Sequence, residues 1–180
     1  MSCFFKRMRL LLLTALVVVP LSSCLGTPDG VTPVANFDAD RYLGRWYEIA
    51  RLDHRFERGL TNVSAHYSRR DDGAIRVLNR GFDVEEGEWD DAEGVARFVD
   101  DDTLGYLKVS FFGPFYGAYV VFELDEHYRY AFVSGPNRGY LWLLARETVV
   151  SAPVRAKFLR RASDLGFDTD DLIWVEHPRR

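Results

Sequence analysis

Few side chains in this sequence could do catalytic chemistry, and they are scattered along it. The histidines are residues 54, 66, 127 and 177, and the cysteines are residues 3 and 24. The sequence has no Gly-x-Ser-x-Gly elbow, His-Glu-x-x-His motif or phosphate-binding glycine loop. Asp53 and His54 are adjacent, but neighbouring side chains on an extended chain point apart. We therefore predict a binding protein without a catalytic site or a cofactor.

Carboxylates concentrate in one run, Asp83–Asp91. Carboxylate oxygens are the ligands that calcium prefers, but this run lacks the spacing of an EF-hand loop. We predict a solvated acidic turn and no metal site.

The overall charge excludes nucleic acid as a partner, since phosphate recognition needs a basic surface. The 180 residues carry a net charge of −4, and 47% of them are hydrophobic, which is enough for one domain with a core. Three of the 23 basic residues, Lys6, Arg7 and Arg9, precede an apolar run at 10–19 that is too short to span a bilayer. Residues 1–23 are therefore predicted to be a secretory signal. The chain from Cys24 onward keeps 20 basic and 27 acidic side chains, a charge of −7.

Cys24 carries the clearest chemistry. The run Leu21-Ser22-Ser23-Cys24 resembles the lipobox of bacterial lipoproteins, in which cleavage exposes a cysteine that is then acylated. We predict a lipid anchor on Cys24 and, because Leu25 rather than Asp follows, an outer-membrane location facing the periplasm. Once the signal is removed, Cys24 is the only thiol, so no internal disulfide can form. The predicted organisation is signal 1–23, lipidated tether 24–36, folded domain 37–177 and tail 178–180.

The body of the chain alternates between short β-rich segments and turn residues. Val63, Ala65 and Tyr67 alternate with polar neighbours, and Asp71-Asp72-Gly73 then supplies a tight turn. Eight strands are predicted, at residues 44–51, 61–69, 74–82, 93–99, 104–112, 117–124, 128–134 and 140–147. Eight strands with short connections favour an all-β, antiparallel up-and-down barrel, which leaves no exposed edge.

The last section changes to helical spacing. Apolar residues recur every three or four positions from Val154 to Leu165, after Ser151, a suitable N-cap. Gly166 ends the pattern. We predict an α-helix that packs by its apolar face, followed at 173–175 by a short strand or an extended segment.

The barrel interior is the candidate binding site. An eight-stranded barrel either fills with side chains or encloses one small ligand. The alternation selects uncharged residues as candidate ligand-binding positions: Ala65, Tyr67, Ala96, Phe98, Leu107, Val109, Phe111, Tyr140 and Trp142. The strands at 117–124 and 128–134 are apolar on both faces, so their phase stays open. The charged connection at 53–58 has two interpretations, a solvated loop or a lid with a polar rim.

Several stretches resemble the lipocalin family. Residues 36–51, with Gly44-Arg45-Trp46, resemble its first motif, a short 3₁₀ segment followed by Gly-x-Trp at the first strand. Residues 141–146 resemble the third motif, whose arginine packs over that tryptophan. The stretches 53–59, 108–117 and 135–142 resemble the bacterial outer-membrane lipocalins in particular. Residues 124–131 depart from the second motif, because they lack its Thr-Asp-Tyr.

The resemblance implies a lipocalin barrel that Trp46 and Arg146 close at one end, and a ligand that is a fatty acid or a lysophospholipid. Three functions stay open: an anchored lipid-binding protein that stores or transports lipid, a lipocalin-fold enzyme on a lipid or isoprenoid, and a ligand-free structural lipoprotein. A carboxylate or histidine deep in the cavity would indicate the enzyme. A homodimer is also open, because Phe115 and Tyr116 are aromatic residues at a predicted turn.

The lipobox predicts the outcome of replacing its cysteine. Cys24→Ser removes the acylated thiol, so the chain should accumulate as an unprocessed or soluble form. Membrane fractionation with mass spectrometry of the N-terminus checks this. A processed Cys24→Ser chain that still pellets with the outer membrane would exclude Cys24 as the anchor.

Overall fold

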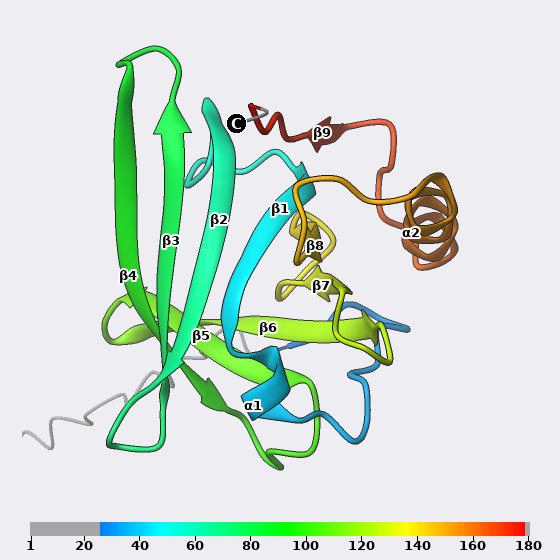
Figure 1. Ribbon diagram of the computed structural model, residues 1–180. Helices are drawn as coiled ribbons and strands as arrows, with labels where there is room; N and C mark the ends of the chain where they lie inside the picture. The colour runs from blue at the N-terminus through cyan, green and yellow to red at the C-terminus, as the bar shows by residue number, and fades with distance from the viewer. Residues whose placement is uncertain (1–25, 179–180) are drawn as a thin grey trace, which may run out of the picture.

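The computed structural model describes residues 26–178, which fold into an eight-stranded antiparallel barrel with a helix on its outer wall (Figure 1). The predicted fold class is thus confirmed, while the signal and Cys24 lie outside the described residues. The elements are α1 (Ala39–Tyr42), β1 (Gly44–Leu52), β2 (Leu60–Arg69), β3 (Ile75–Asp83), β4 (Glu88–Phe98), β5 (Tyr106–Phe112), β6 (Phe115–Leu124), β7 (Tyr130–Ser134), β8 (Leu141–Ala145), α2 (Ala152–Asp164) and β9 (Leu172–Trp174). Within residues 26–178, no helix is long and apolar enough to cross a membrane.

Strand β1 closes the barrel because it pairs on both sides. It pairs with β2 from Gly44↔Tyr67 to Tyr47↔Ser64, and with β8 from Tyr47↔Ala145 onward. The last residues of β1, from Ala50 to Leu52, also pair with β9. Since consecutive strands are antiparallel, their connections alternate between two ends. We call the end with α1 the closed end, and the end with the β1–β2, β3–β4, β5–β6 and β7–β8 connections the open end.

Two sequence predictions need correction. The predicted 3₁₀ segment is one turn of α-helix, because the N–H groups of Tyr42 and Leu43 each donate to the carbonyl four residues back. Most of the predicted acidic turn is paired β-strand. Strand β4 begins at Glu88 rather than near residue 93, and only residues 84–87 form the turn. Pairing with β3 extends the strand where the sequence offers few β-forming side chains.

Helix α2 covers one side of the barrel wall. Its buried residues Phe158 and Ala162 pack against outward side chains of β6, β7 and β8, among them Phe122 and Phe132. Ser151 occupies the N-cap position without a side-chain hydrogen bond there, and Gly166 follows the helix with a φ of +78°. This packing settles the phase that the sequence left open. Within the described barrel, β6 and β7 send these alternate side chains inward: Tyr119, Val121, Ala131 and Val133.

The predicted tether is docked over much of its length. Val31 is buried with the α2 cluster, and the Val34 N–H donates to the Val121 carbonyl at 2.9 Å. The Gly105 N–H donates in turn to the Val34 carbonyl at 2.9 Å. From about residue 28 the chain is therefore part of the folded body.

Trp46 and Arg146 meet at the closed end. The Arg146 guanidinium carbon lies 4.0 Å from the centroid of the fully buried Trp46 ring. Its Nη1 donates to the Arg45 carbonyl at 2.7 Å, and its Nη2 donates to the Arg41 carbonyl at 2.8 Å. Trp46 Nε1 donates to the Tyr42 carbonyl at 2.7 Å. The pair therefore fixes α1 across the bottom of the barrel.

Removing either partner is expected to destabilise the fold. Trp46→Ala should cost about 3–5 kcal/mol of unfolding free energy, as truncation of large buried aromatic side chains does. Arg146→Ala should cost less, and the double mutant should lose less than the sum, because the two side chains are in contact. Denaturant unfolding of the four proteins measures this. Losses that add simply would show that the two residues act independently.

Candidate functional site

The lower half of the barrel interior is filled. Phe37, Tyr42, Trp46 and Tyr128 are buried there together with Leu107. Above them a chain of phenols crosses the barrel. The hydroxyls of Tyr42 and Tyr119 are 2.7 Å apart, and those of Tyr67 and Tyr119 are 2.9 Å apart. Burial raises the pKa of all three, so these phenols stay neutral and bonded to one another.

The barrel interior is less completely buried toward the open end. These inward-facing side chains remain only partly buried: Ala65, Val109, Phe111, Tyr119 and Trp142. Because each points away from the outer surface, its remaining exposure indicates room next to it inside the barrel. Gly94 contributes to this wall, since a Cβ at that position would lie 2.9 Å from the Phe111 ring. We call the region that these partly buried apolar side chains border, on the open-end side of the tyrosines, the candidate chamber.

The other predicted binding residues divide between three places. Tyr67, Ala96 and Leu107 are buried in the packed interior. Phe98 lies at the closed end, with its ring 6.1 Å from that of Phe37, so it faces away from the chamber. Tyr140 lies in the connection before β8, where its ring stacks on Trp142 at 6.1 Å. Whether any of these residues binds ligand stays a prediction.

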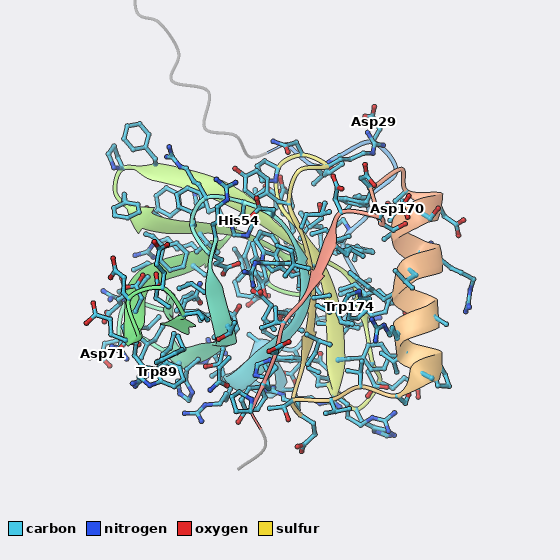
Figure 2. All side chains as sticks on the ribbon, turned by 90° about the horizontal axis from the view of Figure 1, so that it is seen from above. Asp29, His54, Asp71, Trp89, Asp170 and Trp174 are labelled. Atoms are coloured by element: carbon cyan, nitrogen blue, oxygen red, sulfur yellow. The ribbon has the colours of Figure 1, made fainter. Side chains whose placement is uncertain are left out.

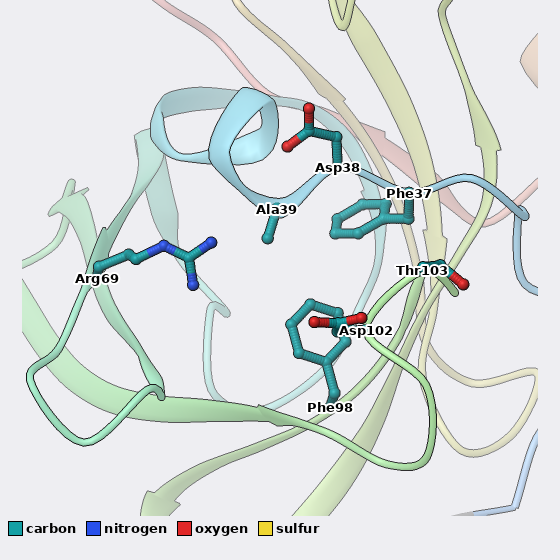
Figure 3. A pocket seen from close by; sticks show the side chains of 7 residues that line it. All are labelled: Phe37, Asp38, Ala39, Arg69, Phe98, Asp102 and Thr103. Atoms are coloured by element: carbon teal, nitrogen blue, oxygen red, sulfur yellow. The ribbon is translucent and has the colours of Figure 1, made fainter.

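Phe98 instead lines a depression of about 240 Å³ beside α1 (Figure 3). The residues around it are Phe37, Asp38, Ala39, Arg69, Phe98, Asp102 and Thr103. Arg69 is already paired with Asp40 at 2.7 Å. This depression is separate from the chamber, because the Trp46 plug lies between them.

A charged cluster that the sequence analysis missed lies beneath the open end. It consists of Glu48 and Arg51 from β1 and of His54 and Glu57 from the β1–β2 connection; Arg51 is 1% exposed and His54 8%. Figure 2 shows His54 within the outline of the barrel, seen from above. The loop is thus neither wholly solvated nor wholly a rim, since His54 and Glu57 point inward while its other three polar side chains are exposed. Asp53 and Arg58 remain outside as an ion pair of 2.7 Å.

Arg51 joins the loop to the strand. Its Nη1 donates to Glu48 Oε1 at 2.7 Å, and its Nη2 donates to the backbone carbonyls of Glu57 at 2.6 Å and Leu60 at 3.1 Å. Arg51 faces inward because the pairing of β1 with β8 shifts between Glu48 and Ala50. This bulge changes the alternation, so the residue three positions after Glu48 shares its face. Strict alternation along β1 predicts that Glu48 faces the same side as Trp46. It does not predict that Arg51 also faces that side.

Glu57 lies at the centre of the cluster. Trp142 Nε1 donates to Glu57 Oε2 at 3.1 Å, and His54 Nε2 lies 3.0 Å from the same oxygen. The His54 ring is 5.2 Å from that of Trp142. Among residues 26–178, neither Arg51 Nε nor His54 Nδ1 has a hydrogen-bond partner. His54 Nε2, in spite of its short distance from Glu57 Oε2, has none within these residues either, so three buried nitrogen atoms are available to a further polar group.

The two buried carboxyls differ in protonation. Burial, and then the negative charge of Glu57, raise the pKa of Glu48 well above its ordinary value, although Arg51 acts in the opposite direction. Burial also tends to raise the pKa of Glu57, but His54 and the Trp142 N–H outweigh it and lower that pKa. Because two carboxylates in one low-dielectric site repel each other, a proton taken up by the pair favours Glu48 over Glu57.

The closed eight-stranded barrel with one helix on its outer wall is the architecture that the lipocalin resemblance implies. The model of the lipocalin-like domain family matches residues 37–177. An outer membrane lipoprotein Blc of Vibrio cholerae is 60% identical over 159 residues, which cover 88% of this chain and 93% of that protein. The Blc of Escherichia coli K12 is 53% identical over 165 residues, with 92% and 93% covered.

Solved structures share the fold. Insecticyanin from the tobacco hornworm Manduca sexta superposes with a TM-score of 0.68 at 22% identity, covering 85% of this chain and 87% of that one. The chain belongs to the lipocalin family. Within it, the protein is a bacterial, lipid-anchored outer-membrane lipoprotein, and its fold and relatives support lipid binding.

The raised pKa of Glu48 predicts a pH-dependent stability. Above the ordinary Glu value of 4.5, the carboxyl stays protonated in the folded protein while it ionises in the unfolded chain. Unfolding then releases a proton, so stability falls as pH rises toward the folded pKa, by up to about 1.4 kcal/mol per pH unit. Glu48→Gln cannot ionise and should gain stability relative to the parent over the same range.

Urea unfolding at several pH values between about 5 and 8 measures this difference. Glu93→Gln is the matched control, because that carboxyl is exposed and Arg76 lowers its pKa. The control should show no such rise. A constant difference between Glu48→Gln and the parent would show that Glu48 is ionised in the folded protein.

Proposed function

We propose that this lipoprotein binds fatty acids or lysophospholipids without chemical turnover, and stores or carries them in the cell envelope for membrane maintenance. The acyl tail would occupy the chamber, and the head group would lie at the charged cluster. The observation that carries the proposal is the order of the layers. Trp142 belongs to the same partly buried apolar set as Val109 and Phe111, and its Nε1 donates to Glu57 of the charged cluster at 3.1 Å.

The chamber suits an acyl tail. Its wall is apolar, and moving hydrocarbon out of water gains about 25 cal/mol per Å² of apolar area. Longer tails should therefore bind more tightly until the tyrosine layer stops them. Tyr42, Tyr67 and Tyr119 satisfy one another's hydroxyls and offer little to a polar head group.

The cluster suits a head group. An ionised carboxylate or phosphate cannot be buried without partners. Arg51 Nε and His54 Nδ1 are unbonded donor or acceptor atoms within the described residues, and both side chains are buried. A head group that displaces Glu57 from Trp142 would reach them. Cys24, the proposed acylation site, would keep this opening close to the membrane.

Blocking the chamber tests the site of binding. Val109→Trp places an indole in the chamber and should reduce affinity for long-chain fatty acids and lysophospholipids at least tenfold. Lys108→Trp is the matched control, because Lys108 is the next residue of β5 and faces outward over Tyr116. Titration with ligands of increasing chain length, followed by Trp142 fluorescence and repeated on Trp142→Phe, measures both variants.

Two results would contradict the proposal. Equal affinity of folded Val109→Trp and Lys108→Trp would place the ligand outside the barrel. Absence of binding by any amphiphile to the delipidated parent, checked by native mass spectrometry, would favour the ligand-free structural function.

A second candidate is an enzyme on a lipid ester or isoprenoid. The observation that favours it is a buried imidazole 3.0 Å from a carboxylate, near a second carboxyl whose pKa burial raises. Such a set could serve as general base and general acid. Release of products from lysophospholipid or isoprenoid substrates by the parent, and its loss in His54→Ala and Glu57→Gln, would support the enzyme. Binding with no product formed would support the carrier.

A further inference from the structure

Large apolar side chains are exposed on two open-end connections. Phe56 in the β1–β2 connection is 57% exposed, while Phe112 and Phe115, which flank the β5–β6 turn, are 71% and 70% exposed. Phe112 and Phe115 pair across the turn, and large apolar side chains exposed at one end of a barrel mark an interaction surface. We call these three residues, with Arg55 and Lys108, the open-end patch.

The charge around these residues is positive. Arg55 lies over the Phe56 ring at 5.1 Å, and Lys108 lies over Tyr116 at 5.4 Å. Asp53 is paired with Arg58, and Glu57 is largely covered and lies 3.0 Å from His54 Nε2, so Arg55 provides the outward charge of its loop. Residues 103–122 contain no Asp or Glu. Aromatic rings beside basic groups are typical of surfaces that insert into the headgroup region of a bilayer.

The third open-end hairpin differs. The turn between β3 and β4 also exposes Val84 and Trp89, but the run Asp83–Asp91 holds six acidic residues. Trp89 is covered by the Arg80 guanidinium at 4.6 Å. Acidic charge keeps this hairpin away from anionic lipid, so it is not part of the patch.

The beginning of the folded chain lies at the same end as the patch. Arg138, in the β7–β8 connection, donates from Nη2 to the Asp29 carbonyl at 2.8 Å and from Nε to the Leu165 carbonyl at 2.7 Å. Figure 2 shows Asp29 beside α2. Cys24 precedes Asp29 by five residues, which span at most about 18 Å when fully extended. A lipid anchor on Cys24 therefore holds this end of the barrel near the bilayer.

We propose that the open-end patch docks on the bilayer that holds the anchor, with its phenylalanines in the headgroup and upper acyl region. The barrel opening then faces the lipid, and an amphiphile moves between membrane and chamber without crossing bulk water. The proposal rests on the anchored location and on the patch. It does not depend on which lipid fills the chamber, so its failure and that of the proposed ligand are distinguishable.

Site-specific fluorescence on the mature, lipidated protein tests the docking. Phe115→Cys is labelled with an environment-sensitive fluorophore in vesicles of phosphatidylethanolamine and phosphatidylglycerol that contain nitroxide-labelled acyl chains. Val149→Cys is the matched control, because Val149 is 78% exposed on the connection that leaves β8 at the closed end. Label at position 115 should shift to the blue and be quenched several-fold more than label at 149.

Equal quenching at the two positions would overturn the proposal. So would a blue shift at position 115 in detergent that depends on protein concentration, since a second copy of the chain would then cover the patch. A functional readout adds to this. Phe112→Ser/Phe115→Ser should keep the parent's affinity for ligand in solution but exchange labelled lipid with vesicles several-fold more slowly. An unchanged exchange rate would also count against docking.

Discussion

The fold depends on β1, the strand that closes the barrel, and on the bulge in that strand. Pairing with β2 and β8 removes both edges of the sheet. Below the bulge, Trp46 fills the closed end and binds Arg146. Above it, the shift in pairing sends Arg51 inward, where its guanidinium holds two carbonyls of the following loop. One strand therefore provides the plug of the barrel, half of its charged cluster and the attachment of the loop over its opening.

The buried charges limit what the interior can do. Burying an ionised group costs several kcal/mol unless partners satisfy it. Here Arg51 pairs with Glu48, whose pKa burial raises, while His54 and Trp142 contact the Glu57 carboxyl. The cluster is nearly neutral as it stands, and a few of its nitrogen atoms are unbonded. It divides an apolar chamber from the open end, which is the arrangement that an amphiphile with one tail requires.

The positions of the anchor, opening and patch follow from one another. The docked segment from residue 28 onward brings the start of the folded chain to the β7–β8 connection. Charge separates the open-end loops into a basic, aromatic side and an acidic hairpin. The same barrel end thus holds the route into the chamber and the side chains suited to a lipid surface.

The sequence by itself determined the class of fold, the order of its strands, the helix and the pairing of Trp46 with Arg146, the last through family resemblance. These follow from local alternation, turn residues and motifs, which depend on neighbours along the chain. Tertiary structure alone decided the phase of β6 and β7, because both faces are apolar and only α2 distinguishes them. It also decided the length of β4, which pairing extends, and the docking of the segment before α1. Above all it decided that Arg51, His54 and Glu57 enter the barrel. A bulge and a folded loop set those directions through contacts between distant strands, and no periodicity in the sequence records them.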